Sequence, residues 1–242
     1  MSTYLLVHGG WHSGQCWERV APLLAAAGHR VLTPTLTGHG DKADLLGPEV
    51  GLDTHVDDVV AVIVENDLTD VILVGHSYAG LVISSAANKV PDRIAHLVYL
   101  DAMVPEDGET AADIRPDVLD LIDIALKSES GWRVPPPPAG PPPLGLFGVT
   151  DAAEVARLRA MLSDQGVLTF QEPVRMDNPA LRTIPRTHIH CTDNPLVDAY
   201  PRRPVPAVQP NGSPAQVWEL PTGHDCMITM PAELTELLLR VS

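Results

Sequence analysis

The segment 71–80, with the sequence Val-Ile-Leu-Val-Gly-His-Ser-Tyr-Ala-Gly, constrains the fold of this chain more than any other segment. Its first four residues are typical of a buried strand, and the segment 81–87 after it is typical of a helix. A serine at the sharp turn between such elements exposes its hydroxyl group to a cleft, which is the nucleophile elbow G-x-S-x-G. Ala79 takes the last position of this motif, and Gly80 follows one residue later. We therefore predict that Ser77 is a nucleophile rather than an ordinary turn residue.

Short apolar segments alternate with helical patterns through most of the remaining chain. Further strands are predicted at 4–7, 30–33, 94–100, 187–191 and 216–220, and further helices at 17–27, 54–66, 117–127, 151–162 and 232–240. Such alternation is typical of an α/β protein, in which helices cover both faces of a mostly parallel sheet. Substrates of open α/β sheets bind at the carboxyl ends of the strands, so the functional residues are expected there.

The alternation stops in the segment 105–184. Within it, residues 135–143 contain seven prolines in nine positions, which cannot donate hydrogen bonds to a sheet and favour a stiff, extended path. We predict one core formed by residues 1–104 and 185–242, with 105–184 inserted as a cap (lid) over the sheet. The Pro-rich stretch is expected to be a spacer. A ligand for an SH3-type domain is the alternative, although flanking basic residues are missing.

Size and net charge limit the class of partner. The chain has 242 residues and is 45% hydrophobic, which supports a single core or one domain with an insertion. Its formal net charge is −15, so nucleic-acid phosphates and anionic membranes would repel it, and no cluster of Lys and Arg offsets this charge locally. We expect a small-molecule substrate and no nucleic-acid or membrane partner. The sequence leaves the oligomeric state open.

The cysteines and the first residues favour a reducing compartment. Cys16, Cys191 and Cys226 are too few and too widely spaced for a disulfide framework or a CxxC metal pair. The chain starts without a basic region before an apolar run, and no apolar run is long enough to cross a membrane. We therefore expect a cytoplasmic protein. His188 and His190 share one face of a predicted strand, but no further ligands are evident nearby, so no metal site is expected.

A serine nucleophile needs a base that accepts its proton and a group that orients the base. His224 lies in the segment 221–225, Pro-Thr-Gly-His-Asp, between the last predicted strand and the closing helix. That loop is expected at the carboxyl edge of the sheet, beside Ser77. An imidazole has an ordinary pKa of about 6.5 and exchanges its proton readily at neutral pH. We predict that His224, one of ten histidines, is the base rather than a surface residue.

Glycines also follow the first predicted strand, in the sequence His-Gly-Gly-Trp at 8–11. Glycine there lets the backbone approach a substrate closely. We expect the N–H groups of Gly10 and Tyr78 to stabilise an oxyanion, and a tight turn alone is the simpler, compatible interpretation.

Several side chains are expected to line the substrate pocket. The residues near the glycine loop and in the cap that we assign to it are Trp11, His12, Cys16 and Phe147. Burial as a small apolar residue is the interpretation that we prefer for Cys16. The cap is expected to add the further apolar side chains Leu119, Ile122, Leu144 and Leu146.

Four segments together resemble the α/β-hydrolases: His-Gly-Gly-Trp at 8–11, Gly-His-Ser-Tyr-Ala-Gly at 75–80, Leu-Val-Tyr-Leu-Asp-Ala at 97–102 and Gly-His-Asp at 223–225. The resemblance covers nearly the whole chain, most weakly in the cap, and is strongest to small esterases akin to plant methylesterases and hydroxynitrile lyases. It implies a six-stranded, mostly parallel sheet with a lid, and acyl chemistry without a cofactor. The length and motifs are also similar to those of actinobacterial esterases that cleave methyl benzimidazole-carbamate (carbendazim) fungicides.

Two positions depart from the pattern of this family. Hydroxynitrile lyases of this type carry a lysine directly after the catalytic histidine, whereas this chain has Asp225, so cyanohydrin cleavage is not expected. The family places the triad acid shortly after the Cys-Thr that ends the penultimate strand, which implies Asp193, with Asp198 as a later candidate. Asp101, after the strand that follows the elbow helix, is the alternative acid, because haloalkane dehalogenases place theirs there. The acid would fix the tautomer of His224.

These residues lead to one main functional hypothesis and two alternatives. The main hypothesis is a serine hydrolase that cleaves a small, largely apolar carboxylic or carbamic ester through an acyl-enzyme, for example a methyl carbamate of an aromatic amine. A lyase or cyclase on the same scaffold would instead use His224 to move protons while Ser77 only orients the substrate. A non-catalytic ligand-binding protein of the same fold is the second alternative. The lyase or cyclase predicts that no acyl-enzyme forms, whereas a binding protein could retain the triad and would show slow turnover with tight retention of its ligand.

Overall fold

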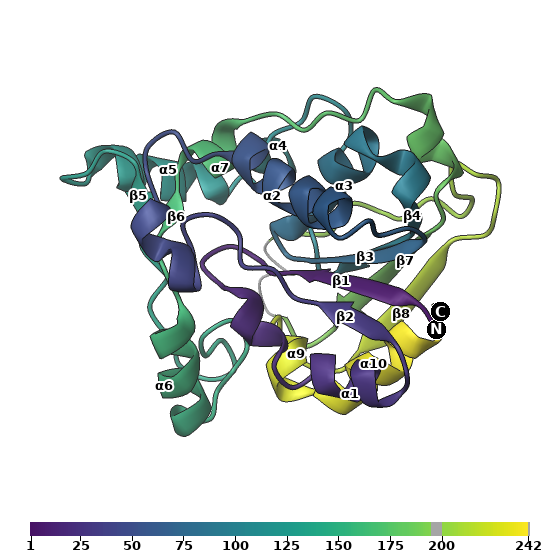
Figure 1. The fold of residues 1–242 in the computed structure, drawn as a ribbon. Coiled ribbons are helices and arrows are strands. Elements are labelled where there is room, and N and C mark those ends of the chain that lie inside the picture. The colour runs from purple at the N-terminus through teal and green to yellow at the C-terminus, as the bar shows by residue number, and fades with distance from the viewer. Residues whose placement is uncertain (195–199, 242) are drawn as a thin grey trace.

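The computed structural model describes residues 1–194 and 200–241. Its centre is a sheet of six strands in which all neighbours are parallel (Figure 1). From one edge to the other, the strands are β2 (Arg30–Leu32), β1 (Thr3–Val7), β3 (Val71–His76), β4 (Ile94–Leu100), β7 (Arg186–Cys191) and β8 (Gln216–Leu220). The six-stranded parallel sheet of an α/β fold is therefore confirmed, and the carboxyl ends of all six strands lie at one end of the sheet.

Helices form a layer on each face of this sheet (Figure 1). The first layer consists of α2 (Leu52–Glu65) and α3 (Ala79–Lys89), and the second of α1 (Ala21–Ala26), α9 (Cys226–Thr229) and α10 (Pro231–Leu239). Alternate side chains of a strand point to opposite faces, so Leu5 belongs to the core under the first layer and Leu6 to the core under the second. Burial on both faces explains why the strands are almost continuously apolar in sequence.

One predicted helix begins later than expected. The helix predicted at 17–27 begins at Ala21, because Pro22 lacks the backbone N–H that a helix interior requires and fits only the first turn. The residues before it form a short 3₁₀-helix, Gly14–Trp17. Further 3₁₀-helices lie at Gly40–Leu45, Pro91–Arg93 and Pro179–Thr183.

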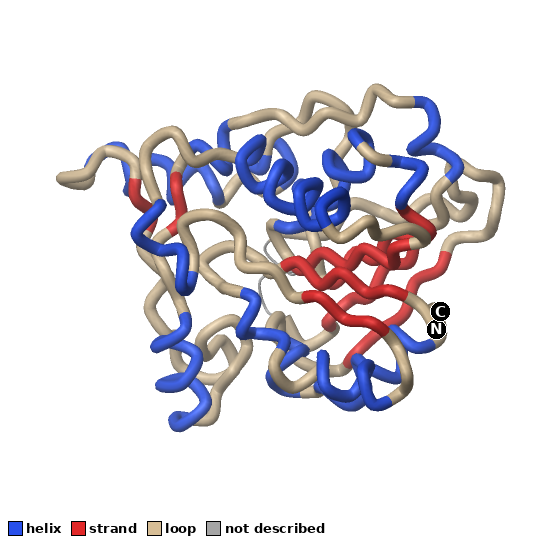
Figure 2. Tube along the Cα trace, viewed as in Figure 1, coloured by secondary structure: helices blue, strands red, loops and turns tan. Residues whose placement is uncertain are grey.

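The segment between β4 and β7 stands outside the main sheet. Its elements are α4 (Ala111–Ile114), α5 (Val118–Lys127), β5 (Arg133–Val134), α6 (Ala152–Met161), β6 (Gln165–Gly166) and α7 (Leu168–Gln171). Strands β5 and β6 pair in an antiparallel manner. Each has only two residues, which is too short to produce a recognisable strand pattern in the sequence. Figure 2 shows that loops join these short elements beside the carboxyl end of the main sheet.

The last part of this segment returns along α3. The backbone N–H of Arg175 donates to the hydroxyl oxygen of Ser85 (3.2 Å), and that of Asn178 donates to the side-chain oxygen of Asn88 (2.8 Å). Ser85 and Asn88 both lie on α3. The cap at 105–184 stays a prediction as a unit, and its C-terminal part is bonded to a helix of the core.

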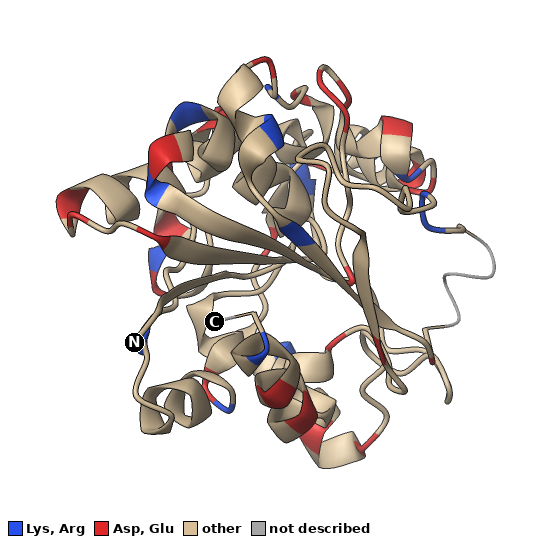
Figure 3. Cartoon of the chain, turned by 90° about the vertical axis from the view of Figure 1, so that its right-hand side faces the viewer, with Lys and Arg blue, Asp and Glu red and all other residues tan. Residues whose placement is uncertain are grey.

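Acidic residues lie on the helices of both layers (Figure 3), as expected for a formal net charge of −15. Among the described residues, no helix has the length and apolar character needed to cross a membrane.

Candidate active site

Ser77 occupies the turn between β3 and α3. Its φ angle is 55°, in the left-handed region that residues other than glycine rarely adopt. The surroundings hold this conformation: the N–H of Ser77 donates to the carbonyl of Leu100 (3.1 Å), and its carbonyl accepts the N–H of Met103 (3.0 Å). Backbone strain that is held in this way by neighbouring elements is common at functional sites.

Two glycines let the strand, the helix and a third segment approach one another at this turn. A Cβ atom on Gly75 would lie 2.7 Å from the carbonyl oxygen of Ala79, and one on Gly80 would lie 1.9 Å from that of Met103. Neither separation is possible for a real side chain. Gly80 lies one residue beyond the usual motif, and glycine is required there because the loop after β4 leaves no room for a side chain.

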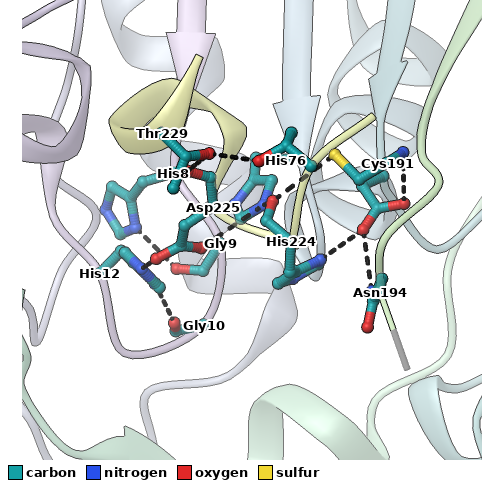
Figure 4. A network of polar contacts seen from close by, with 12 residues as sticks. His8, Gly9, Gly10, His12, His76, Cys191, Asn194, His224, Asp225 and Thr229 are labelled. Atoms are coloured by element: carbon teal, nitrogen blue, oxygen red, sulfur yellow. Dashed lines mark hydrogen bonds and ion pairs between the residues drawn. The ribbon is translucent and has the colours of Figure 1, made fainter. Parts of the chain in front are cut away.

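His224 follows β8, and its ring contacts a carboxylate that follows β4. The Nδ1 atom of His224 is 2.6 Å from Oδ2 of Asp101. The same carboxylate accepts hydrogen bonds from the N–H of Cys191 (3.2 Å) and the amide of Asn194 (3.1 Å), and it contacts the guanidinium of Arg202. Figure 4 shows that His224, Cys191 and Asn194 lie close together on this side of the site. Because Nδ1 faces an acceptor, the neutral ring carries its proton there, and Nε2 is free to accept another.

The surroundings of Asp101 keep its carboxylate charged although it is only 8% exposed. Burial alone would raise the pKa of this group. The hydrogen bond and charge of His224, together with those of Arg202, instead hold the pKa of Asp101 well below its ordinary value. A carboxylate that stays ionised in this position stabilises the imidazolium that forms when the ring accepts a proton.

The structure pairs His224 with Asp101, the alternative acid, and not with Asp193, which the family resemblance implies. The backbone N–H of Asp193 donates to the carbonyl of Thr222 (3.0 Å), so the chain still follows the β8 side after β7 ends. This pairing leaves the side chain of Asp193 exposed to solvent. The later candidate, Asp198, lies outside the described residues.

Strand register explains why Asp101 meets the elbow. Strands β3 and β4 are adjacent, and His76 pairs with Leu100. Ser77 directly follows β3 and Asp101 directly follows β4, so the two residues lie at the same end of the sheet. In the sequence, Asp101 could be recognised as a candidate acid because it is a carboxylate directly after a buried strand.

The predicted oxyanion donors lie on two turns, Gly10 on the loop after β1 and Tyr78 directly after Ser77. His8 accepts the N–H of Leu36 at Nε2 (3.0 Å), so its Nδ1 atom carries the ring proton and donates to the carbonyl of Gly9 (2.9 Å). In the part of the chain that the structure describes, the backbone N–H groups of Gly10 and Tyr78 donate no hydrogen bond. Both groups are therefore available to a substrate oxygen.

Trp11 attaches this loop to the cap. Its backbone N–H donates to the side-chain oxygen of Gln165 (3.0 Å), its indole N–H donates to the carbonyl of Val134 (3.0 Å), and its carbonyl accepts the N–H of Ser163 (2.9 Å). Val134 belongs to β5 and Gln165 to β6. The small antiparallel sheet, which the sequence pattern does not reveal, thus supports the loop that carries Gly10.

A cavity of about 210 Å³ adjoins Ser77 and His224. Trp11 and Phe147, both predicted to line the pocket, form part of its wall, with ring centroids 5.9 Å apart. Its other walls include Gly10, Tyr78, Met103, Arg115, Val118, Leu121 and Phe170. The lining is mostly apolar, and two of its charged side chains, Arg115 and Asp117, pair with each other (2.8 Å).

Two residues predicted to line this pocket are buried and do not line it. Cys16 is 3% exposed and packs in the core under the second helix layer. His12 is 2% exposed, and its ring turns away from the cavity to pair with Asp225. The sequence placed both near Trp11 but could not show which way their side chains point.

The cap reaches the cavity partly through residues that were not predicted. On α5, Val118 and Leu121 line the cavity, whereas Leu119 lies on the opposite face of the helix. The predicted cap residues other than Phe147 lie elsewhere: Leu119 and Leu144 are exposed, and Ile122 and Leu146 are buried in the two cores.

Four buried histidines near the site are uncharged, mainly because burial lowers the pKa of each below its ordinary value. They are His8, His39 and His76, with pKa values of about 3 for the last two, and His55, with a pKa of about 4. His55 shows why the neutral ring fits: Nε2 donates to the carbonyl of Thr37 (2.9 Å), and Nδ1 accepts the hydroxyl of Tyr78 (3.0 Å).

We expect the free energy of unfolding to fall as the pH drops below about 6.5, the ordinary pKa of histidine. In the unfolded chain these histidines bind protons near that pH, whereas in the folded protein they stay neutral down to pH 4 or lower. Their contribution is therefore complete above the unfolded pKa and is lost as the pH falls toward the folded values. Urea titrations at a series of pH values measure this loss.

His55→Gln provides the comparison for this pH dependence. Removing one such group should reduce the slope of stability against pH by up to about 1.4 kcal/mol per pH unit in the acidic range. A free energy of unfolding that stays constant in wild type from about pH 6.5 to about pH 4.5 would contradict the assignment of neutral rings.

His76, His224 and Asp225 place one potential metal-ligand atom each within 4.8 Å of one another. Each of the three residues already uses one such atom elsewhere: Nε2 of His76 contacts the carbonyl of His224 (3.1 Å), Oδ2 of Asp225 contacts His12 (2.9 Å), and Nδ1 of His224 contacts Asp101 (2.6 Å). We therefore assign no metal or other cofactor to these residues.

The family of this chain follows from comparison with known proteins. The Alpha/beta hydrolase family matches residues 4–237, nearly the whole length. The chain belongs to this family. This α/β-hydrolase is 37% identical to a carbendazim hydrolyzing esterase from Nocardioides sp. (strain SG-4G), over 98% of both chains.

Two further relatives agree with the resemblance found in the sequence. Methylesterase 1 of Arabidopsis thaliana is 24% identical, over 99% of this chain and 95% of that protein. An extracellular alpha/beta-hydrolase from a Paenibacillus species, described as sharing homology with tobacco salicylic acid binding protein 2, superposes with a TM-score of 0.78. It is 25% identical, over 100% of this chain and 99% of that one. The similarity to plant methylesterases and to a carbendazim esterase is thus confirmed, and it supports an enzyme of the carboxylesterase type.

Proposed function

We propose that this α/β-hydrolase is a serine esterase that cleaves a compact, largely apolar carboxylic or carbamic ester through an acyl-enzyme. The observation that carries this proposal is the 2.6 Å contact between Nδ1 of His224 and Asp101, beside a cavity that Ser77 also lines. The backbone N–H groups of Gly10 and Tyr78, which donate to no acceptor among the described residues, supply the oxyanion site.

In the proposed reaction, Oγ of Ser77 attacks the carbonyl carbon of the ester while Nε2 of His224 accepts its proton. The carbonyl oxygen becomes an oxyanion that the N–H groups of Gly10 and Tyr78 stabilise. When the tetrahedral intermediate collapses, the bond to the leaving alcohol breaks, and the alcohol takes the proton from His224. Water, activated by the same imidazole, then releases the acyl group and restores Ser77.

The cavity supports an uncharged substrate with an aromatic or other flat apolar group. Trp11, Phe147 and Phe170 contribute aromatic rings to its wall, and Leu121 contributes an aliphatic side chain. The net charge of −15 disfavours anionic substrates. The carbonyl of a carbamate would occupy the same oxyanion site, so a methyl carbamate of an aromatic amine, as the name of the carbendazim relative indicates for that protein, is our leading substrate class.

Trapping the acyl-enzyme tests this function. The purified protein would be assayed with a panel of aryl acetates, methyl esters and methyl carbamates, and mixed rapidly with p-nitrophenyl acetate before intact-mass measurement. We expect turnover of uncharged esters and an acetyl group on Ser77. Proton transfer without any covalent adduct would favour a lyase or cyclase, and tight retention of ligand without turnover would favour a binding protein.

The wall of the cavity provides a prediction about substrate size. Leu121→Phe should place a larger side chain in the cavity and lower kcat/KM for a bulky aryl ester by about tenfold or more, while acetate esters lose much less. Leu119→Phe is the matched control, because Leu119 lies on the same helix but is 57% exposed and outside the cavity. Equal effects of the two substitutions on the ratio of bulky to small ester would rule out this cavity as the substrate pocket.

A further inference from the structure

A buried histidine outside the proposed triad contacts two hydrogen-bond acceptors. Nδ1 of His12 is 2.7 Å from the carbonyl oxygen of Gly10, and Nε2 is 2.9 Å from Oδ2 of Asp225. A carbonyl oxygen and an ionised carboxylate oxygen only accept hydrogen bonds, so both ring nitrogens must carry a proton. His12 is therefore an imidazolium that donates in both directions, and Figure 4 shows it between Gly10 and Asp225.

The electrostatic environment agrees with this assignment. Burial alone would lower the pKa of His12, but the charge and hydrogen bond of Asp225 raise it above its ordinary value. Burial alone would raise the pKa of Asp225, and His12 is the main cause that lowers it instead. The nearby His76, whose Nε2 lies 3.9 Å from Asp225, stays neutral with a pKa of about 3. His12 is thus the cation that balances the charge of Asp225.

This ion pair joins the two loops that carry the proposed chemistry. His12 lies on the loop after β1, two residues beyond Gly10, and Asp225 directly follows His224 in the loop after β8. Both members are almost fully buried, at 2% and 0% exposure. A buried ion pair contributes little net stability compared with apolar residues, so stability alone does not explain its presence.

The pair also restricts a flexible part of the backbone. Glycine explores more backbone conformations than other residues, and the loop has two in succession. The carbonyl of Gly9 is held by Nδ1 of His8 (2.9 Å), and the carbonyl of Gly10 is held by Nδ1 of His12 (2.7 Å). The N–H of Gly10 shares a peptide plane with the carbonyl of Gly9, which also accepts the backbone N–H of His12 (3.3 Å). The bond from Nδ1 of His12 fixes the following plane, so His12 holds the loop on both sides of Gly10, and the direction of its N–H is fixed.

We infer that the His12–Asp225 ion pair is a positioning pair, which aims the N–H of Gly10 at the substrate oxygen and fixes the oxyanion loop relative to His224. This inference rests on the proposed esterase function and adds to it two residues that do not contact the substrate. The oxyanion is present only in the transition state and the tetrahedral intermediates, so the pair should affect kcat far more than KM.

Asp225→Asn tests the inference in the intact protein. In this variant His12 is neutral, and the amide at position 225 can donate to Nε2 while Nδ1–H still donates to the carbonyl of Gly10. Both hydrogen bonds lose the charge assistance that strengthens them, so the loop is less well held. We expect kcat for p-nitrophenyl acetate to fall about 10- to 100-fold, with little change in KM. Affinity for an aryl trifluoromethyl ketone, which forms a tetrahedral adduct, should fall by the same factor.

Ile63→Ala controls for a general loss of stability. Ile63 is fully buried near the end of α2, and its carbonyl accepts the N–H of Leu68 shortly before β3 begins, at the opposite end of the sheet from Ser77. This variant should be destabilised but keep the kcat of wild type. A normal kcat in a folded Asp225→Asn variant, or equal losses in both variants, would overturn the inference.

The charge of His12 is measured separately on the wild-type protein, which covers the case of a variant that does not fold. Long-range ¹H–¹⁵N NMR spectra, assigned with the help of His12→Gln, should show two ring N–H groups on His12 above pH about 6.5, where ordinary histidine is neutral. A neutral ring with one N–H would overturn the inference even if the esterase function holds. If wild type hydrolyses no ester, the proposed function fails, and the spectrum still reports whether the ion pair exists.

Discussion

Ser77→Ala should abolish the hydrolysis of p-nitrophenyl acetate, with a loss in kcat of about 10⁴-fold or more, while the protein stays folded. Alanine removes the only atom that the proposed mechanism bonds to the acyl group. It adds no bulk at a turn where φ is already 55° and where Leu100 and Met103 hold the backbone through their own backbone groups. Steady-state kinetics and far-ultraviolet circular dichroism measure the two parts of this prediction.

Ser85→Ala is the matched control for the nucleophile. Ser85 is a buried serine on α3, and its hydroxyl oxygen accepts the N–H of Arg175 rather than facing the cavity. This variant should keep its activity, and a fluorophosphonate probe should label it as it labels wild type but fail to label Ser77→Ala. Substantial turnover by Ser77→Ala would remove the assigned nucleophile and, with it, the acyl-enzyme.

Asp101→Asn should lower kcat by about 10⁴-fold, whereas Asp193→Asn should leave it nearly unchanged. With an amide at position 101, the N–H at Nδ1 of His224 no longer has a carboxylate acceptor. This change favours the wrong tautomer of His224 and removes the charge that stabilises the imidazolium. Asp193 is exposed, and the structure bonds its backbone, not its side chain, to the β8 loop. Kinetics on the same uncharged ester measure both variants.

The two aspartate variants are each other's control because they differ from wild type by the same atoms. Thermal unfolding checks that Asp101→Asn remains folded, since Arg202 and the N–H of Cys191 lose a charged partner there. A larger loss in Asp193→Asn than in Asp101→Asn would return the role of acid to Asp193. Equal, small losses in both would mean that neither carboxylate orients His224.

Short-range features of the sequence were sufficient for the sheet and the elbow. Buried parallel strands are apolar along their whole length, so β3, β4 and β8 could be located to within a residue or two. The turn that carries Ser77 depends on small residues that are adjacent in the chain. Loops after parallel strands share one end of the sheet, so the sequence alone assigns Gly10, Ser77 and His224 to the same edge.

Only the tertiary structure decided which side chains face one another at that edge. The choice between Asp101 and Asp193 depends on the register of β3 with β4 and on the bond from Asp193 to Thr222, and residue order contains neither. The pairing of His12 with Asp225 joins residues 213 positions apart. A strand pattern fixes where a chain segment ends, but the direction of the next side chain depends on its neighbours in space, because those neighbours supply its hydrogen bonds and charges.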